Sequence, residues 1–511
     1  MAPPAPYKNR PEYEYALTYA NNIADLLTPQ TGAYYEIWLD GEKAVSLEED
    51  PAVVAAREGS TPTLEARAGV EPIYGTHYMP RKFKCAVTVP GDNSVDLFSQ
   101  DVGLVVIVDS DGNLEGFNVY AGGGLGRTHN KEETFARVAD PIGFVGKDDV
   151  YELVKAVVAT QRDYGDRVER RHARMKYLIH DWGVDKFRDT VEGYFGKVLD
   201  PIRETPPFEY RDFLGWHEQG DGRYFLGISV ENGRVKDEGD FKLRSALREI
   251  VETFYIPMLV TPQQNVLIYD IEAGDREKIN KILKDSGVMA VEEIDPLVRR
   301  SMACPALPTC GLAITESERA LPSILDRVRS LMTKVGLEDE HFVVRMTGCP
   351  NGCARPYLAE LALVGSGSNA YQVWLGGAPN HTRLARPIVQ KLKDPDLESF
   401  LEPIFVYFTR SRQGTESFGD FCDRVGFATL MHFIQAYKPS LEEQQDKNPQ
   451  DSEKSLEAPV AQQSTPGKKR HRVGVQDNNY ASLKQLAADR NQPVTALVNE
   501  VLAAYLETQK R

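Results

Sequence analysis

The sequence predicts an α+β fold, because strand-like and helix-like segments occur along the chain in two arrangements. One is a weak internal repeat: residues 102–129 and 359–385 each combine an apolar strand, a turn of Gly, Ser and Asn, a second strand, and glycines before a basic residue. The other is a smaller unit at about 206–290, in which strand patterns alternate with helical patterns at 243–254 and 275–287. The glycines that end each repeat admit close backbone approach to a bulky anionic ligand.

The composition describes an acidic globular protein of several domains. The chain has 511 residues, of which 41% are hydrophobic and 26% are charged, and its net charge is −15. Such a surface repels nucleic acid and anionic membranes, so an anionic substrate needs a local basic pocket. The sequence shows neither an apolar run of membrane-helix length nor the apolar core of a signal peptide. We therefore expect a cytoplasmic protein.

Six cysteines are too sparse for a disulfide scaffold in a chain of this length. Two of them, Cys85 and Cys422, stand alone and are expected to be small buried hydrophobes. The other four form two close pairs with 38 residues between the pairs, and neighbouring Pro, Asn and Gly residues place them on loops: Cys304, Cys310, Cys349 and Cys353. On loops, several thiolates can converge on one centre.

The spacing of the four loop cysteines leaves three interpretations open. Zinc suits four thiolates, but structural zinc sites favour C-x2-4-C spacing at both ends. Here the pairs are C-x5-C and C-x3-C, and the longer arm fits the wider perimeter of an iron–sulfur cube better. Spacing alone therefore favours a [4Fe–4S] cluster over zinc or over plain burial of the thiols.

Lys82 and Lys84 lie in an alternating stretch, residues 82–89, that predicts a strand. Strand side chains alternate between two faces, so both ammonium groups are expected on the same face. A solvated edge strand often carries such lysines. The alternative is a basic pocket for an anion.

Two segments, SMACPALPTC at 301–310 and RMTGCPNGCARP at 345–356, resemble the paired cluster signature of sirohaem-dependent sulfite and nitrite reductases. Further blocks are similar to that family in the same order, so the resemblance covers about residues 1–437: 36–42, 78–87, 116–129, 160–167, 261–268 and 418–426. The family is built from pseudo-two-fold pairs of α+β units with ferredoxin-like small units. The resemblance thus implies the same architecture here.

The resemblance also implies the cofactors and their ligands. The four loop cysteines would hold a [4Fe–4S] cluster, with Cys353 bridging to the sirohaem iron. Lys82 and Lys84 would bind an oxyanion and supply protons, and Arg81 would pair with a sirohaem carboxylate. Sirohaem carries eight carboxylates, and further candidates to bind them, which could equally form surface ion pairs, are Arg127, Arg162, Arg167, Arg174, Lys176, Gln264, Asn265, Thr309, Asn351 and Arg355.

The implied activity is assimilatory sulfite reduction, the six-electron conversion of sulfite to sulfide. Nitrite reductases of the family usually have a neutral residue at the position of Lys84, so this lysine favours sulfite. Ferredoxin is the expected donor because no flavin or nicotinamide domain is visible, although a separate flavoprotein subunit could take its place. A ferredoxin–nitrite reductase is a second candidate, and an inactive truncated reductase that acts as a scaffold or associates with DNA is a third.

The expected domains are a first sirohaem/sulfite reductase domain at 1–205, a ferredoxin-like domain at 206–290 and a second sirohaem/[4Fe–4S] domain at 291–437. Residues 438–469 have the composition of a disordered linker. Residues 470–511 predict a strand–helix–helix tail, outside the family, that is similar to ribbon–helix–helix domains. That tail could self-associate as a helical hairpin or contact DNA weakly.

A complete family member has about one further domain before the counterpart of the first residues. That stretch supplies the first small unit, sirohaem contacts and arginines of the anion pocket. We therefore expect a misplaced start, a fragment or a truncated gene. In a chain of these residues alone, the cofactor pocket would be open on one side.

Overall fold

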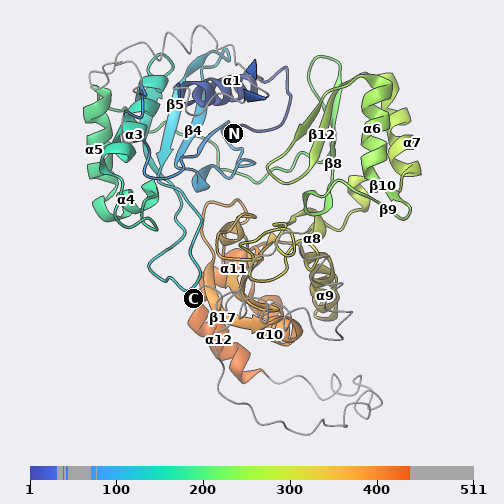
Figure 1. Ribbon diagram of the computed structural model, residues 1–511. Helices are drawn as coiled ribbons and strands as arrows, with labels where there is room; N and C mark the ends of the chain where they lie inside the picture. The colour runs from blue at the N-terminus through green and yellow to red at the C-terminus, as the bar shows by residue number, and fades with distance from the viewer. Residues whose placement is uncertain (31–37, 40–41, 44–70, 76–77, 438–511) are drawn as a thin grey trace, which may run out of the picture. The chain divides into compact units, whose positions relative to one another are not determined.

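The computed structural model describes residues 1–30, 38–39, 42–43, 71–75 and 78–437 (Figure 1). The chain divides into two compact units, Met1–Tyr437 and Lys438–Arg511, and the architecture below is that of the first unit. The predicted linker at 438–469 and the predicted tail at 470–511 lie outside the described residues. Most of the family-like block at 36–42 does so as well.

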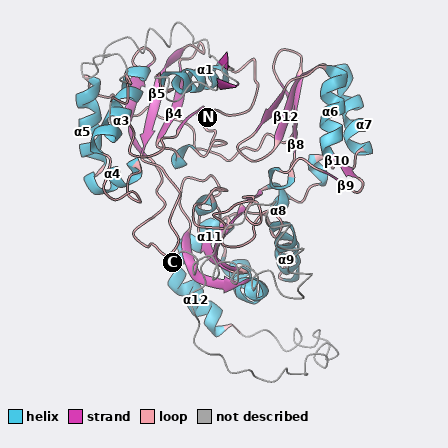
Figure 2. Cartoon of the chain, in the orientation of Figure 1, coloured by secondary structure: helices cyan, strands magenta, loops and turns pink. Residues whose placement is uncertain are grey.

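The first part of the unit is a four-stranded sheet with helices packed around it (Figure 2). Its strands, in spatial order, are β3 (Cys85–Thr88), β4 (Val102–Val108), β5 (Leu114–Ala121) and β6 (Asp140–Gly146). Strands β3 and β4 are parallel, and the other neighbours are antiparallel. The helices that share a core with this sheet are α1 (Pro11–Leu26), α3 (Val150–Tyr164), α4 (Met175–Trp182) and α5 (Val184–Phe195).

The second part is a smaller antiparallel sheet backed by two helices (Figure 1). Its strands, in spatial order, are β11 (Met258–Val260), β12 (Val266–Ile271), β8 (Tyr224–Ile228) and β7 (Gly215–Glu218). The apolar stripes of α6 (Leu243–Phe254) and α7 (Arg276–Asp285) pack on the buried residues of β8 and β12. A two-stranded ribbon, β9 (Asp237–Glu238) and β10 (Phe241–Lys242), precedes α6. The strand–helix alternation predicted for this region is confirmed.

The third part is a five-stranded mixed sheet with its own hydrophobic core. Its strands, in spatial order, are β13 (Ser301–Ala303), β14 (Val344–Thr347), β15 (Leu361–Gly367), β16 (Ala370–Leu375) and β17 (Arg386–Lys393). The first three are parallel, and the last two are antiparallel to their neighbours. The helices of this part are α8 (Pro296–Arg299), α9 (Leu321–Lys334), α10 (Leu397–Ser411), α11 (Phe418–Val425) and α12 (Phe427–Ala436).

The predicted internal repeat corresponds to equivalent positions in the two larger sheets. Strands β4 and β5 form an antiparallel hairpin beside the parallel strand β3, and β15 and β16 form the same hairpin beside the parallel strand β14. A further antiparallel strand follows in each, β6 in one and β17 in the other. The α+β class and the pseudo-two-fold arrangement are therefore confirmed.

The sequence predicted a strand that carries both lysines, and this prediction is wrong about where the strand begins. Strand β3 begins at Cys85, so Lys82 and Lys84 lie in the loop before it. The backbone N–H of Lys84 donates to the Asp101 side chain, 2.9 Å away, instead of to a neighbouring strand. The carbonyl of Lys84 accepts from the N–H of Val102 in β4 at 3.0 Å, so one backbone bond joins this loop to the sheet just before β3 begins.

No described helix has both the length and the apolar character that a bilayer span requires.

Candidate site for an iron–sulfur cluster and an anion

The first thiol of each cysteine pair is placed by adjacent parallel strands. Cys304 directly follows β13, and Cys349 lies two residues beyond β14. Parallel neighbours end at the same edge of a sheet, so the two loops begin side by side. The backbone N–H of Cys304 donates to the carbonyl oxygen of Met346 at 3.2 Å, which fixes the first loop to the second strand.

The two remaining thiols lie on turns that follow. The N–H of Cys310 donates to the carbonyl of Ala306 at 2.7 Å, which closes the first turn. In the second, Gly352 has φ +68°, a left-handed conformation that favours glycine. Cys304 and Cys349 are each 8% exposed, Cys310 is half-buried and Cys353 is exposed. One end of the cysteine group is thus closed by protein and the other is open.

The thiols of Cys349 and Cys353 lie close enough to other cysteine thiols to interact with them electrostatically. Burial raises the pKa of Cys349, and the other three cysteine thiols raise it further. Burial likewise raises the pKa of Cys353, while Lys82 and Lys84 lower it. The exposed thiol therefore lies on the side of the two lysines.

The donor set fits a four-iron cluster. Within the described ranges, no three His, Cys, Asp or Glu side chains approach closely enough to hold a single metal ion. A cube of iron and sulfide keeps its thiolates farther apart than one tetrahedral zinc does, so the spacing fits the cluster better. The N–H of Gly348 also donates to the sulfur of Cys304 at 3.3 Å. A Cβ on Gly348 would lie 2.6 Å from the Cβ of Ala306, so the loop has no room for a side chain there.

The cationic side of the site contains the predicted Arg81, Lys82 and Lys84, all exposed. Surrounding protein strips part of the hydration of Lys84 and lowers its pKa, and Arg174 and Lys82 lower it further. Asp101 opposes that shift, and Arg355 adds to it. Four cations and one carboxylate thus act on the same small region next to Cys353.

Asp101 was not anticipated from the sequence. Its side chain is buried, and Arg174 binds it at two points, Nη2 to Oδ2 at 2.7 Å and Nε to Oδ1 at 3.2 Å. Nothing in the local sequence distinguishes this aspartate from a strand-capping residue, because its partners lie 17 and 73 positions away.

Arg127 joins the glycine-rich segment, residues 122–126, to the second cysteine loop, and Lys176 binds the same segment. The N–H of Arg127 donates to the carbonyl of Pro350 at 3.0 Å, and its guanidinium lies over Trp374 at 4.9 Å from the ring centroid. The buried ammonium of Lys176 donates to the carbonyls of Gly124, Gly126 and Phe135. An ammonium has three donors, so Lys176 uses all of them on backbone oxygens. Its predicted contact with a cofactor carboxylate stays a prediction.

Arg355 belongs to a buried network that joins all three parts of the unit. Its Nε donates to Asp96 Oδ2, and its Nη2 donates to the carbonyl of Pro262 at 2.7 Å. Arg345 Nη1 donates to the same Asp96 oxygen at 3.0 Å, and His381 Nδ1 lies 2.6 Å from Asp96 Oδ1. Arg355 follows Cys353 by two residues, so this network fixes the end of the second cysteine loop. Asp96, Arg345 and His381 were also missed.

Burial and ion pairing determine which groups of this network are charged. Burial alone would raise the pKa of Asp96, but Arg345 and Arg355 hold it well below its usual range. Burial lowers the pKa of His381 to about 4, so its ring is neutral and its Nδ1–H donates to Asp96. One carboxylate therefore serves two buried or half-buried arginines.

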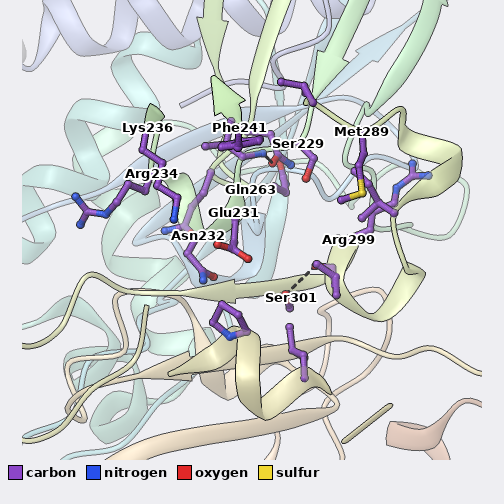
Figure 3. Close-up of a pocket in the computed structure, with 18 of the residues that line it drawn as sticks. Ser229, Glu231, Asn232, Arg234, Lys236, Phe241, Gln263, Met289, Arg299 and Ser301 are labelled. Atoms are coloured by element: carbon purple, nitrogen blue, oxygen red, sulfur yellow. Dashed lines mark hydrogen bonds between the residues drawn. The ribbon is translucent and has the colours of Figure 1, made fainter. Parts of the chain in front are cut away.

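Gln264 and Asn265 lie in the turn between β11 and β12. Gln264 Nε2 donates to the carbonyl of Ala303 at 2.9 Å, next to Cys304, and Asn265 Oδ1 accepts from the N–H of Val230 at 2.9 Å. Both also line a cavity of about 530 Å³, which Figure 3 shows with Gln263, Arg299 and Ser301 around it. The turn thus connects the small sheet to the first cysteine loop.

The remaining predicted contacts lie at the margin of the site. Thr309 and Asn351 are exposed on the two cysteine loops. Arg162 pairs with Asp163 and donates to the carbonyl of Ile73 at 2.7 Å. Arg167 donates to the carbonyl of Tyr78 at 2.6 Å, three residues before Arg81. These two arginines hold the segment that leads to the lysines.

Four thiols on neighbouring loops, open toward a group of cations, are the arrangement expected of a site for an iron–sulfur cluster and an anion. The sequence pattern of the nitrite and sulphite reductase 4Fe-4S domain matches residues 18–199 and 295–440. That of the nitrite/sulfite reductase ferredoxin-like half domain matches residues 217–286. The chain therefore belongs to the nitrite and sulphite reductase family, which confirms the resemblance.

Similar proteins include the "Sulfite reductase [ferredoxin]" of Synechococcus elongatus, 61% identical over 506 residues. This alignment spans 99% of the chain and 77% of the relative. The "Sulfite reductase [NADPH] hemoprotein beta-component" of Methylorubrum extorquens is 42% identical over 81% of the chain and 65% of that relative. The solved structure of the Mycobacterium tuberculosis NirA protein has a TM-score of 0.58 and 25% identity, over 69% of this chain and 64% of that one.

The residues after 440 lie beyond the matched family patterns, as expected for the tail. The alignment with the Synechococcus relative nevertheless includes nearly all of them, because it covers 506 of the 511 residues. The expectation that the tail is foreign to the family's members is therefore wrong with respect to that relative.

Proposed function

We propose that the chain catalyses assimilatory sulfite reduction, in which sulfite takes up six electrons and seven protons and yields hydrosulfide and three waters. The observation that carries this proposal is the pair Lys82 and Lys84, both cationic and both acting on Cys353, the exposed thiol of the cluster site. The name of the 61% identical Synechococcus relative supports the same reaction. The complete cysteine and lysine set favours an enzyme over an inactive scaffold.

The cofactors are a [4Fe–4S] cluster and sirohaem, which when bound supply electrons to the sulfur atom of the substrate. Cys304, Cys310, Cys349 and Cys353 would hold the cluster, with Cys353 nearest the cationic side. Arg81, Arg174 and Arg355 are the cations proposed to bind sirohaem carboxylates or the substrate.

The lysines have two tasks in this proposal. Their positive charge holds an oxyanion, and their N–H groups deliver protons as the sulfur–oxygen bonds break. A lowered pKa makes Lys84 the better proton donor, because its neutral form is less costly than that of an ordinary lysine. Protons can return from solvent, since both side chains are exposed.

Lys84→Asn tests the choice of sulfite over nitrite. In wild-type holoenzyme, sulfite should be reduced with the lower KM, and the variant should lose sulfite turnover by about tenfold or more while nitrite turnover changes less. The assay measures sulfide and ammonia from the same preparation with one reduced dye as donor. A wild-type enzyme that reduced nitrite far better than sulfite, with the lower KM, would make the chain a nitrite reductase.

Ferredoxin is proposed as the electron donor, as in the name of the Synechococcus relative. A pocket of about 620 Å³ lies beside Pro350, the residue after Cys349. Its lining includes Arg127, His129, Lys131, Glu132 and Lys391. Its excess of positive charge suits an acidic electron carrier. The chain's free cysteines are compatible with the reducing cytoplasm, which we propose as its location.

A further inference from the structure

The carboxylate of Asp101 lies where three segments of the candidate site meet. It accepts hydrogen bonds from the backbone N–H of Lys84 at 2.9 Å and from Nε and Nη2 of Arg174. The backbone carbonyl of Asp101 accepts the N–H of Gly122, also at 2.9 Å. Asp101 therefore connects the loop that carries Lys82 and Lys84, Arg174 before α4, and the glycine-rich segment that begins at Gly122.

These bonds have little freedom to rearrange. The side chain of Asp101 is fully buried, and a buried carboxylate is stable only with its partners in place. Arg174 is confined as well, because a Cβ on Gly124 would come within 3.1 Å of its Nη2. A side chain at that position would crowd the guanidinium that reaches Asp101.

The position of Asp101 also decides the charge balance at Lys84. Arg174, Lys82 and Arg355 are the cations that act on Lys84, and Lys84 in turn lowers the pKa of Cys353. Asp101 is the carboxylate that opposes these cations. Burial raises the pKa of Asp101, and Arg174 and the Lys84 N–H counter that rise.

We propose that Asp101 is a positioning residue for the anion site. It fixes the backbone of Lys84 and the guanidinium of Arg174 at a set separation before the anion arrives. This inference rests on the proposed function, since it concerns the same site. Asp101 itself touches neither substrate nor cofactor.

Asp101→Asn in the holoenzyme tests the proposal, because asparagine keeps the size but loses the charge and turns an NH2 group toward existing donors. The dissociation constant for sulfite, followed by the absorption change of the oxidised holoenzyme, should rise about tenfold or more. KM for sulfite should rise with it, while KM for the electron donor stays unchanged. The basic limb of the pH profile of kcat/KM should move to lower pH, because Lys84 loses its counter-charge.

Asp92→Asn is the matched control. Asp92 is another buried carboxylate of the same part of the chain, and it accepts from Tyr13 Oη at 2.9 Å and from the N–H of Ser94 at 2.7 Å. This control should lower thermal stability but leave sulfite affinity and the pH profile as in wild type. If both variants weakened sulfite binding equally, or if Asp101→Asn bound sulfite normally, the positioning role would be wrong.

A second variant covers the case in which Asp101→Asn does not fold, and a second readout separates this inference from the proposed function. If Asp101→Asn does not fold, Arg174→Lys removes the two-point contact but keeps the charge, and it should weaken sulfite binding in the same assay. Failure of the proposed function looks different: the wild type would bind sulfite or another oxyanion without producing sulfide, and Asp101→Asn would still weaken that binding. Normal sulfite binding in Asp101→Asn and in Arg174→Lys would overturn this inference and leave the proposed function standing.

Discussion

Asp96→Asn tests how much the buried network around Asp96 contributes to the stability of the fold. Asp96 Oδ2 accepts from Arg345 at 3.0 Å and also from Arg355, and both Asp96 and Arg345 are 1% exposed. Removal of one partner from a buried ion pair costs about 3–5 kcal/mol, because the other charge stays buried and uncompensated. At a few degrees per kcal/mol, the transition temperature of the affected domains should fall by about 10 °C.

The assay for Asp96→Asn is calorimetry together with the iron content of the purified chain. The variant should also lose iron faster during dialysis, since Arg355 fixes the loop that carries Cys349 and Cys353. The pKa of Asp96 is depressed in the folded state, so its contribution is present above the unfolded value of about 3.9 and is lost below it. The difference from wild type should therefore be constant from pH 6 to 8.

Asp109→Asn is the control for this experiment, because Asp109 accepts hydrogen bonds within an exposed turn. Its effect should be below about 1 kcal/mol. Equal transition temperatures for Asp96→Asn and wild type, with equal iron retention, would refute the view that the network stabilises the cluster loop.

Two other predictions concern pH and the electron donor. Since the pKa of His381 is lowered to about 4, the unfolded chain binds a proton at higher pH than the folded chain, and stability should fall by about 2 kcal/mol from pH 7 to 5. His381→Gln should lack this loss in calorimetry at the two pH values, and an unchanged loss would contradict the assignment. Lys391→Glu should raise KM for ferredoxin several-fold but leave turnover with a small dye unchanged, because it reverses a charge beside Pro350. Lys278→Glu on α7, beside Asp275, is the charge-matched control, and the same increase in both variants would show a general charge effect.

The parts of the site that the sequence predicted are those encoded by local patterns. The two cysteine pairs can be recognised within a few residues because Pro, Asn and Gly flank them. The hairpin repeat can be recognised from alternating apolar residues and turn residues. The structure adds the reason the pairs meet: Cys304 and Cys349 follow neighbouring parallel strands.

The parts that the sequence could not predict depend on contacts between distant residues. Asp96 lies 249 positions from Arg345 and 285 from His381, and none of the three has a distinctive neighbourhood. Asp101 is similar, because only folding brings Lys84 and Arg174 to the same carboxylate. The error at Lys84 has the same origin, since the side chain of Asp101 binds the Lys84 N–H just before β3 begins, while the Lys84 carbonyl still accepts from Val102.

The most direct test of the account is one experiment on the purified chain loaded with iron, sulfide and sirohaem. Absorption and electron paramagnetic resonance spectra would report both cofactors, and product analysis under reducing conditions would measure sulfide formed per sulfite consumed. The account predicts a cluster that is coupled to sirohaem, one sulfide for each sulfite, and loss of the coupled signal in Cys353→Ser but not in Cys422→Ser. A chain that took up both cofactors and produced no sulfide would contradict it.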